Sequence, residues 1–203
     1  MGRLSKSRYR ARRAEGQNDV LEAQRLRFAA FRGGDGIDSD AFDEICDHIL
    51  IEDVSSGRVV ACFRLLPLTD GREITRSYAA QFYELSALEA YEGRMVEMGR
   101  FCIHPTVKDP DVLRVAWAAM TRFVDETGTD LLFGCSSFWG CEAEGYLDAF
   151  AMLQERHLAP KRWLPRVPAP AVFSFARRLR RTPDPQRALP TMPPPLRAYH
   201  ALR

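Results

Sequence analysis

The sequence predicts an α/β fold with one mixed, mostly antiparallel sheet flanked by helices. Three observations support this fold class. Short apolar runs have the length of strands, four longer segments have helical spacing, and a strand–helix–strand–helix succession extends from residue 95 to residue 156. With 203 residues, of which 46% are hydrophobic, the chain is long enough to bury the core of one domain.

The expected elements begin with a helix and a hairpin. Asn18 or Asp19 can cap a helix that extends to about Arg32, where a glycine-rich turn ends it. Ile49–Val54 and Arg58–Leu66 are expected to pair as a hairpin around a Ser-Ser-Gly turn. The later elements are a helix over Thr75–Ala87, a strand over Met95–Ile103, a helix from Asp109 to Thr127, a strand over Leu131–Cys135, a helix over Glu142–Arg156, and strands over Leu158–Val167 and Ala171–Phe175.

Charge is distributed unevenly, although the net charge is only +2. Residues 1–14 carry six Lys or Arg and no acid, residues 15–155 carry twelve against twenty-six acids, and residues 156–203 carry eleven against one. We therefore expect a basic flexible N-terminus over 1–14, a folded domain over 15–176, and a basic, proline-rich segment over 177–203. Basic ends on an acidic body indicate an anionic partner, with solvated tails as the alternative.

Two features bear on the compartment. No apolar run is long enough to cross a membrane, and the basic N-terminus is not followed by the apolar core of a signal peptide. Five cysteines, an odd number without the spacing of a disulfide framework, indicate reduced thiols. We therefore expect a cytoplasmic protein.

The expected strand over residues 95–103 contains two opposite charges, Glu97 and Arg100, on either side of Gly99. Charges are rarely buried in a strand unless they are paired or used in chemistry. In strict alternation the two side chains would face opposite sides of the sheet, and a bulge at Gly99 would bring them to one face. Two interpretations stay open: a structural salt bridge, or a site built on a kinked strand.

A second charged feature is the acidic segment that precedes the hairpin, with Asp38, Asp40 and Asp43. It lacks the glycine and the twelve-residue spacing of an EF-hand loop, which argues against a calcium site. Its carboxylates would either recognise a cationic group or form a solvated loop.

Two Cys-x-His pairs are candidate metal ligands: Cys46 with His48, and Cys102 with His104. At this spacing both side chains of a pair share one face of a strand, and two pairs would make a Cys₂His₂ zinc set. Nothing in the sequence places the pairs together. We therefore expect no metal.

Four pieces of sequence within residues 24–158 resemble the acyl-carrier-protein-dependent N-acyltransferases of the GNAT-like superfamily. They are Arg27-Phe28, the Asp38-x-Asp40-x-x-Asp43 triplet, Arg64-Leu65-Leu66-Pro67 and Glu97-Met98-Gly99-Arg100-Phe101. Finer text, such as Cys46-Asp47-His48 and the late Pro-Pro-Leu-Arg-Ala-Tyr, is more similar to the ornithine N-acyltransferases of ornithine-lipid synthesis than to the related acyl-homoserine-lactone synthases. The resemblance implies a GNAT-like sheet with a splayed central strand pair.

The resemblance implies transfer of a (3-hydroxy)fatty acyl group from acyl carrier protein to the α-amine of L-ornithine. The usual GNAT pyrophosphate loop is absent between His104 and Leu113, which suits a carrier that presents only a phosphopantetheine arm, and no separate cofactor is expected. Alternatives are an acyl-homoserine-lactone synthase that uses S-adenosylmethionine, an acyltransferase for another amino acid such as glutamine, and a non-catalytic lipid- or carrier-binding module. Family chains commonly continue further, so the end at Arg203 is consistent with a truncation that removes a final strand.

Residue roles follow from the resemblance and from the chemistry of amide formation, which needs a base for the amine. The catalytic candidates are Glu97, as the base, and Arg100. The candidates for binding ornithine are Arg27, Asp38, Asp40, Asp43 and Arg64, unless the aspartates pair with the arginines inside the protein. The candidates for the acyl chain and the phosphopantetheine arm are Gly99, Phe101, Ser136, Ser137 and Phe138. No Gly-x-Ser-x-Gly elbow surrounds the serines, so no serine nucleophile is expected.

The basic C-terminal segment is the expected contact with an anionic partner. Arg177, Arg178, Arg180 and Arg181 follow aromatic residues and would attract acyl carrier protein or an anionic membrane at its inner face. We expect peripheral, salt-sensitive membrane attachment. Nucleic acid is not expected, because no binding motif accompanies the arginines.

Overall fold

The structure is a computed structural model that describes residues 7–167, 173 and 179–201. The chain forms two compact units. The first comprises residues 1–73 and 92–134 and contains the sheet, and the second comprises residues 74–91 and 135–203.

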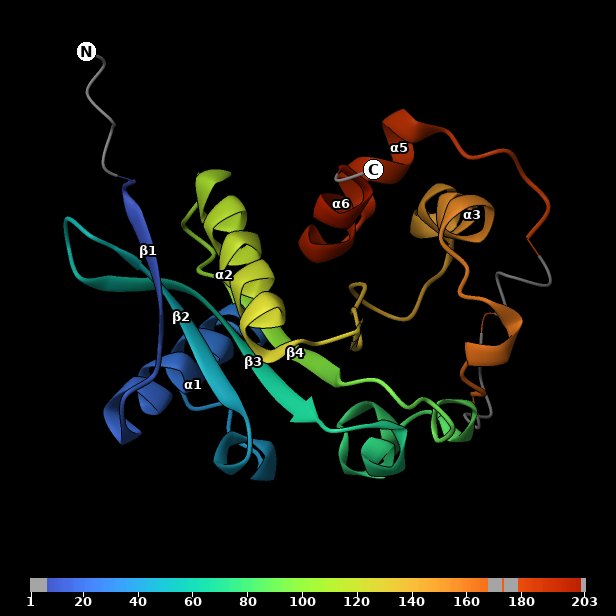
Figure 1. The fold of residues 1–203 in the computed structure, drawn as a ribbon. Coiled ribbons are helices and arrows are strands. Elements are labelled where there is room, and N and C mark those ends of the chain that lie inside the picture. The colour runs from blue at the N-terminus through green and yellow to red at the C-terminus, as the bar shows by residue number, and fades with distance from the viewer. Residues whose placement is uncertain (1–6, 168–172, 174–178, 202–203) are drawn as a thin grey trace, which may run out of the picture. The chain divides into compact units, whose positions relative to one another are not determined.

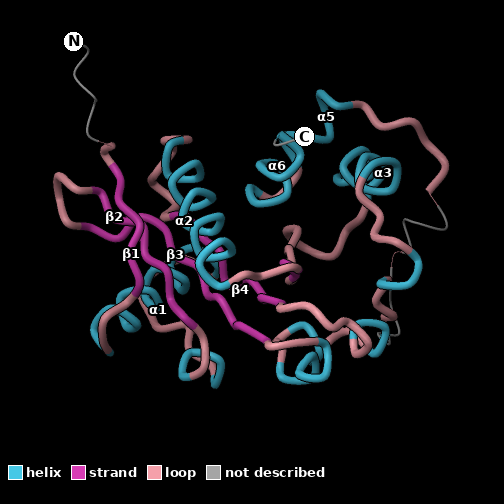
Figure 2. The backbone as a smooth tube through the Cα atoms, viewed as in Figure 1, coloured by secondary structure: helices cyan, strands magenta, loops and turns pink. Residues whose placement is uncertain are grey.

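The first unit is built on a five-stranded sheet in the order β1-β2-β3-β4-β5, and Figures 1 and 2 show β1 to β4 side by side. The pairs β1–β2, β2–β3 and β3–β4 are antiparallel, and β5 runs parallel to β4. The strands are Tyr9–Arg13 (β1), Asp47–Asp53 (β2), Arg58–Leu68 (β3), Met95–Ile103 (β4) and Leu131–Phe133 (β5). The mixed, mostly antiparallel sheet is confirmed, and β4 has the predicted bounds.

Helices α1 (Gln17–Phe31) and α2 (Asp111–Thr127) cover opposite faces of this sheet (Figure 1). The α2 residues on the sheet side recur every three or four positions, as one apolar stripe requires: Val112, Ala116, Met120 and Phe123. They pack on Ile49, Ile51, Phe63, Leu65 and Val96. The α1 face is smaller and joins Ala23 and Leu26 to Leu50, Val59, Cys62 and Cys102. Gly128 ends α2 in the left-handed region, with φ 62°.

β4 contains one residue more than β3 needs to pair with it. Cys62 lies opposite Cys102, whereas Arg64 lies opposite Gly99, so a single residue of β3 faces two residues of β4. Arg100 stands in this bulge with φ 53°, in the left-handed region that non-glycine residues seldom adopt. The predicted bulge therefore exists, and it follows Gly99 directly.

The bulge sets which face of the sheet each residue of β4 occupies. Met98 packs among the apolar residues under α2, so the preceding Glu97 faces the α1 side. After the bulge, Phe101 packs again under α2 and Cys102 packs toward α1. The side chain of Arg100 joins a polar network on the α1 side, so Glu97 and Arg100 share one face, as predicted.

β5 pairs with β4 over three residues only, and the last pair is Glu97 with Phe133. The next residue, Gly134, has φ 155°, and a Cβ atom there would lie 2.2 Å from the carbonyl oxygen of Met98. Only glycine fits this close approach. β4 continues to Ile103 after β5 has ended, so the two strands pair over their first residues only, and the splay that the resemblance implied stays a prediction.

The expectation that residues 1–14 form no element was wrong for residues 9–13, which form β1. Tyr9 is buried, and the arginines of this segment pair with acids of β2. Arg10 Nη2 lies 2.9 Å from Glu52 Oε2, and Arg8 Nη2 lies 2.8 Å from Asp53 Oδ2. The basic N-terminus thus neutralises an acidic strand edge that lies about forty residues away in the sequence.

The predicted cap of α1 was also wrong, because Gly16 occupies the N-cap position without a side-chain hydrogen bond. The carboxylate of Asp19 instead accepts from Arg12 Nη2 at 2.8 Å and from the backbone N–H of Glu15 at 2.8 Å.

The second unit contains α3 (Leu147–Arg156), α5 (Pro185–Thr191) and α6 (Pro194–Ala201). Four buried residues join α5 to α3: Ala149, Met152, Ala188 and Met192. The carboxylate of Asp148 also accepts from the backbone N–H of Asp184 at 3.2 Å. The alternative of a solvated C-terminal tail therefore does not hold for residues 185–192. The Asp184 cap and Pro185 at the first helical position explain where α5 begins.

The helix predicted over Thr75–Ala87 was wrong. The segment makes short 3₁₀ turns at Ala79–Gln81 and Ser86–Leu88, after another over Gly71–Arg76. The buried Ser77 hydroxyl donates to the Ile74 carbonyl oxygen at 2.7 Å and accepts from the Ala80 N–H at 3.2 Å. These side-chain bonds compete with the helical pattern.

The strand predicted over Leu158–Val167 was wrong as well. Pro160 and Pro165 remove ladder donors, and the segment keeps a 3₁₀ turn at Lys161–Trp163 and one bridge, between Glu84 and Arg166. The strand predicted over Ala171–Phe175 falls outside the described residues, apart from Phe173. In the described part of the chain, no helix combines the length and apolar character needed to cross a membrane.

Candidate active site

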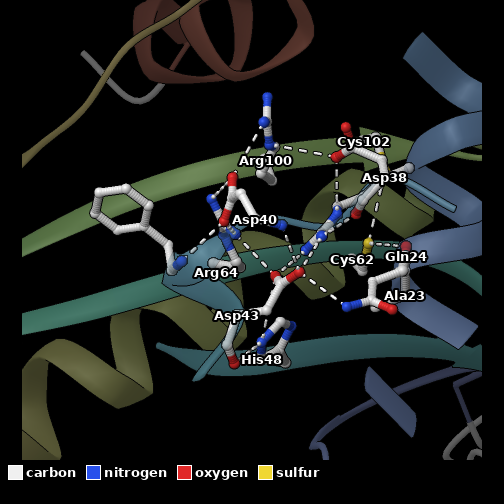
Figure 3. A network of polar contacts seen from close by, with 12 residues as sticks. Ala23, Gln24, Asp38, Asp40, Asp43, His48, Cys62, Arg64, Arg100 and Cys102 are labelled. Carbon is white, nitrogen blue, oxygen red and sulfur yellow. Dashed lines mark hydrogen bonds and ion pairs between the residues drawn. The ribbon is translucent and has the colours of Figure 1, made fainter. Parts of the chain in front are cut away.

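A network of three arginines and three aspartates lies on the α1 side of the sheet (Figure 3). Its members come from four parts of the first unit: Arg27 from α1, Asp38, Asp40 and Asp43 from the acidic segment, Arg64 from β3 and Arg100 from the bulge of β4. The structure thus brings together five residues predicted to bind substrate and one predicted to be catalytic.

Asp43 is the most heavily bonded member of the network. Its Oδ1 accepts from Arg27 Nη1 at 2.7 Å and from Arg64 Nη1 at 2.8 Å. Its Oδ2 accepts from Arg27 Nη2 at 2.8 Å, from Gln24 Nε2 at 2.9 Å and from the Asp40 N–H at 3.3 Å. Both oxygens are therefore saturated with donors inside the protein.

Asp40 and Arg100 form the partly exposed end of the network. Asp40 Oδ2 accepts from Arg64 Nη2 at 3.1 Å and from Arg100 Nη2 at 3.2 Å. Arg100 Nε also lies 3.3 Å from Asp38 Oδ2. The side chains of Asp40 and Arg100 are 24% and 27% exposed, whereas those of Arg27, Arg64, Asp38 and Asp43 are buried.

The acidic segment has this shape because its own residues cap it. Asp40 caps the 3₁₀ turn Ala41–Glu44 by accepting from the Phe42 N–H at 2.9 Å, and the Asp43 carboxylate accepts in return from the Asp40 N–H. His48, buried at the start of β2, has Nε2 3.0 Å from the carbonyl oxygen of Asp43. A carbonyl only accepts, so Nε2 carries the proton.

These surroundings set the charge states. Burial raises the pKa of the Asp43 carboxyl, but the hydrogen bonds from Arg27, Arg64 and Gln24 outweigh it and hold that pKa well below its usual range. The pKa of the Asp40 carboxyl is also lowered: burial raises it, but the hydrogen bond and charge of Arg64 lower it by more. Each carboxylate of this pair therefore stays ionised near neutral pH.

Glu97 is buried on the same face, opposite Leu66 of β3 and Phe133 of β5. Burial raises the pKa of the nearby Cys46 thiol to about 11. The charge of Arg64 lowers this pKa and the charge of Glu97 raises it. A carboxylate thus stands where the parallel pairing of β4 and β5 ends. Its assignment as the base stays a prediction.

The residues predicted to bind the acyl chain and phosphopantetheine arm lie in different parts of the fold. Gly99 lies opposite Arg64 in the ladder. Phe101 stacks on Phe63, with ring centroids 5.9 Å apart, on the α2 side and therefore on the face opposite to Glu97. Ser136, Ser137 and Phe138 belong to the second unit. There Phe138 packs edge-on against Tyr146 and Phe150.

Sequence reasoning missed two members of this region. Gln24 was not singled out, although it lies one helical turn before Arg27 on the same face of α1. His48 was named as a possible metal ligand and as part of the family-like text, but its contact with the acidic segment through the Asp43 carbonyl was not predicted. Among the described residues, no group of three or more His, Cys, Asp and Glu side chains is arranged to hold a metal ion.

Comparison with known proteins gives a family match and several relatives, of which three are described. Residues 21–118 match the model of an acetyltransferase (GNAT) domain. The chain is 33% identical over 175 residues to the L-ornithine N(alpha)-acyltransferase of Rhodobacter capsulatus, covering 78% of this chain and 68% of that protein. A protein of the same name from Rhizobium meliloti is 26% identical, over 100% of this chain and 74% of that protein. An acyl-homoserine-lactone synthase of Agrobacterium fabrum is 33% identical over 89 residues, 43% of this chain and 41% of that protein.

Proposed function

This chain belongs to the L-ornithine N(alpha)-acyltransferase family within the GNAT acyltransferases, and we propose that it acylates the α-amine of L-ornithine. The donor in this proposal is a (3-hydroxy)fatty acyl group carried as a thioester on acyl carrier protein, and the product is a lyso-ornithine lipid. The phosphopantetheine thioester is the donor substrate, so the reaction uses no separate cofactor.

The observation that carries this proposal is the buried carboxylate of Glu97 at the end of the β4–β5 pairing. An α-amine is mostly protonated at neutral pH and attacks a thioester only after losing a proton. In the proposed reaction Glu97 takes that proton, directly or through one water. The amine nitrogen then bonds to the thioester carbon, the carbon–sulfur bond breaks, and the proton passes to the departing thiolate.

The ion-pair network supports a division of labour among the candidate binding residues. Arg27 and Asp43 are buried and saturated by each other and their neighbours, so they are proposed to shape the site without touching substrate. The partly exposed pair Asp40 and Arg100 is then available to recognise the amino-acid substrate. We assign the ornithine carboxylate to Arg100 and its side-chain ammonium to Asp40, since each would find the opposite charge there.

One assay tests the function against its rivals. Purified protein is incubated with 3-hydroxyacyl carrier protein and either ornithine, glutamine, lysine or S-adenosylmethionine, and the lipid fraction is read by mass spectrometry. We expect N-acyl-ornithine to dominate. An acyl-homoserine lactone from S-adenosylmethionine would support the synthase activity of the Agrobacterium fabrum relative instead. Absence of any acylated amine would leave a carrier-binding module.

We also propose that the protein works at the inner face of an anionic membrane, where an amphiphilic product is taken up. Support comes from the eleven Lys and Arg residues against one acid over residues 156–203. Arg177 and Arg178 lie outside the described residues. Arg181 is ion-paired, with Nη2 3.0 Å from Asp148 Oδ1, so it contributes less to such attachment than the sequence suggested.

A further inference from the structure

The segment Leu158–Val167 of the second unit exposes apolar and basic side chains side by side. Leu158, Leu164 and Val167 are 46%, 38% and 43% exposed. The exposed basic residues of the same segment are Lys161, Arg162 and Arg166. Single exposed aliphatic residues are ordinary, but three within ten residues is an unusual density for a solvent-facing segment.

Contacts with residues 84–91 hold this segment in place. The Glu84 N–H donates to the Arg166 carbonyl oxygen at 2.9 Å, and the Arg166 N–H donates to the Glu84 carbonyl oxygen at 2.9 Å. Trp163 packs edge-on against Tyr91, with ring centroids 5.4 Å apart. Phe82, two residues before the bridge, is a further large apolar residue that is 51% exposed. The arrangement is therefore a fixed presentation of side chains.

The local charge is strongly positive. Residues 156–167 contain four Lys or Arg and no Asp or Glu. The nearest described acid paired with the segment is Glu84, whose Oε2 lies 3.6 Å from Arg166 Nε in an exposed pair that water screens. An anionic partner is therefore attracted to a surface that also offers aliphatic side chains.

The combination of the two chemistries selects the partner. A nucleic acid would be drawn to the cations but gains little from leucine and valine. The headgroup region of an anionic bilayer accepts both, because phosphates meet the cations while short aliphatic side chains enter the acyl boundary. Trp163, which is half-buried, adds an aromatic ring of the kind enriched at membrane interfaces.

We propose that Leu158–Val167 is an interfacial segment through which the second unit binds the surface of an anionic bilayer. Lys161, Arg162 and Arg166 bind lipid phosphates, and Leu164 and Val167 enter the boundary between headgroups and acyl chains. The proposal rests on exposure, charge and anchoring, and it does not depend on which amine the protein acylates.

The test is co-sedimentation of the full chain, without substrates, with phosphatidylglycerol-containing vesicles and with pure phosphatidylcholine vesicles, at low and high salt. The charge variant is Lys161→Gln/Arg162→Gln/Arg166→Gln. Its affinity for anionic vesicles should fall by about fivefold per charge, on the order of 100-fold in total. The apolar variant Leu164→Ser/Val167→Ser keeps every charge and should bind on the order of tenfold more weakly.

A matched control removes the same number of exposed positive charges from the first unit, as Arg10→Gln/Arg72→Gln/Arg114→Gln. It should bind anionic vesicles within about twofold of wild type, and thermal unfolding should show all variants folded. The proposal is overturned if the charge variant binds like wild type, if the control loses as much affinity, or if the apolar variant is unaffected. Loss of acyl carrier protein binding with vesicle binding intact would reassign the segment to the carrier.

Discussion

Replacing Asp43 with asparagine tests whether the ion-pair network is structural. Each oxygen of Asp43 accepts a hydrogen bond from at least one guanidinium group, Arg27 at both oxygens and Arg64 at Oδ1. An asparagine amide would place its NH₂ group, a donor, against one of these donors in either orientation. The substitution also leaves three guanidinium groups with two carboxylates. Removing one partner of a buried ion pair destabilises proteins by about 3–5 kcal/mol, and we expect Asp43→Asn to fall in that range.

Asp40→Asn is the matched comparison, because it removes the same charge from the same network. Its side chain is 24% exposed, so water compensates part of the loss. We expect about 1–2 kcal/mol of destabilisation. Urea unfolding followed by circular dichroism measures both variants, with the slope m checked for constancy. Equal losses for the two variants, or a loss below about 1 kcal/mol for Asp43→Asn, would refute the view that burial makes this network essential.

The pH dependence of the same measurement gives an independent check. The folded-state pKa of Asp43 is depressed below the unfolded value of about 3.9, so its stabilisation is present above that pH and is lost as the pH falls below it. Wild-type stability should therefore decline steeply below about pH 4, and the Asp43→Asn variant should decline less steeply.

Three further predictions concern single residues. Glu97→Gln keeps the shape of the side chain and removes the base, so turnover should fall by orders of magnitude while the urea midpoint changes little, and near-wild-type turnover would make Glu97 structural. Gly134→Ala should destabilise the protein by more than about 2 kcal/mol in urea unfolding, because the new Cβ would lie 2.2 Å from the Met98 carbonyl oxygen. Gly99→Ala is the control: it has open space around it and should destabilise the protein by less than about 1 kcal/mol. Burial lowers the folded-state pKa of His48, so stability should fall as the pH drops below about 6.5, and His48→Gln should flatten that slope; an unchanged slope would remove His48 from the account.

The parts of the fold that sequence analysis predicted are those with local signals. β4 ends at a proline-containing turn, and α2 shows an apolar stripe and a terminal glycine, so neither requires knowledge of distant residues. β1 could not be predicted in this way, because its arginines become strand residues only beside Glu52 and Asp53. The segment over residues 75–87 has helical spacing, and it loses the helix to hydrogen bonds of a buried serine.

Sequence analysis named most residues of the candidate site but did not predict how they are arranged. Arg27, Arg64 and the aspartate triplet were named together, but sequence alone left two uses for the aspartates. The structure shows them paired with the arginines, which is the alternative of internal pairing. Phe101 could not be assigned to a face without the position of the bulge, and that position depends on the register with β3.

The extra residue in β4 determines which face of the sheet carries Arg100. Deleting Phe101 would let β3 and β4 pair as an uninterrupted ladder, and the backbone at Arg100 would lose its strained left-handed conformation. The shortened strand would nevertheless carry its charged side chains on alternate faces, with a guanidinium directed into the apolar layer under α2. Length changes in this strand should therefore be tolerated far less than substitutions, and a homologous sheet without the extra residue would carry the two charges on opposite faces.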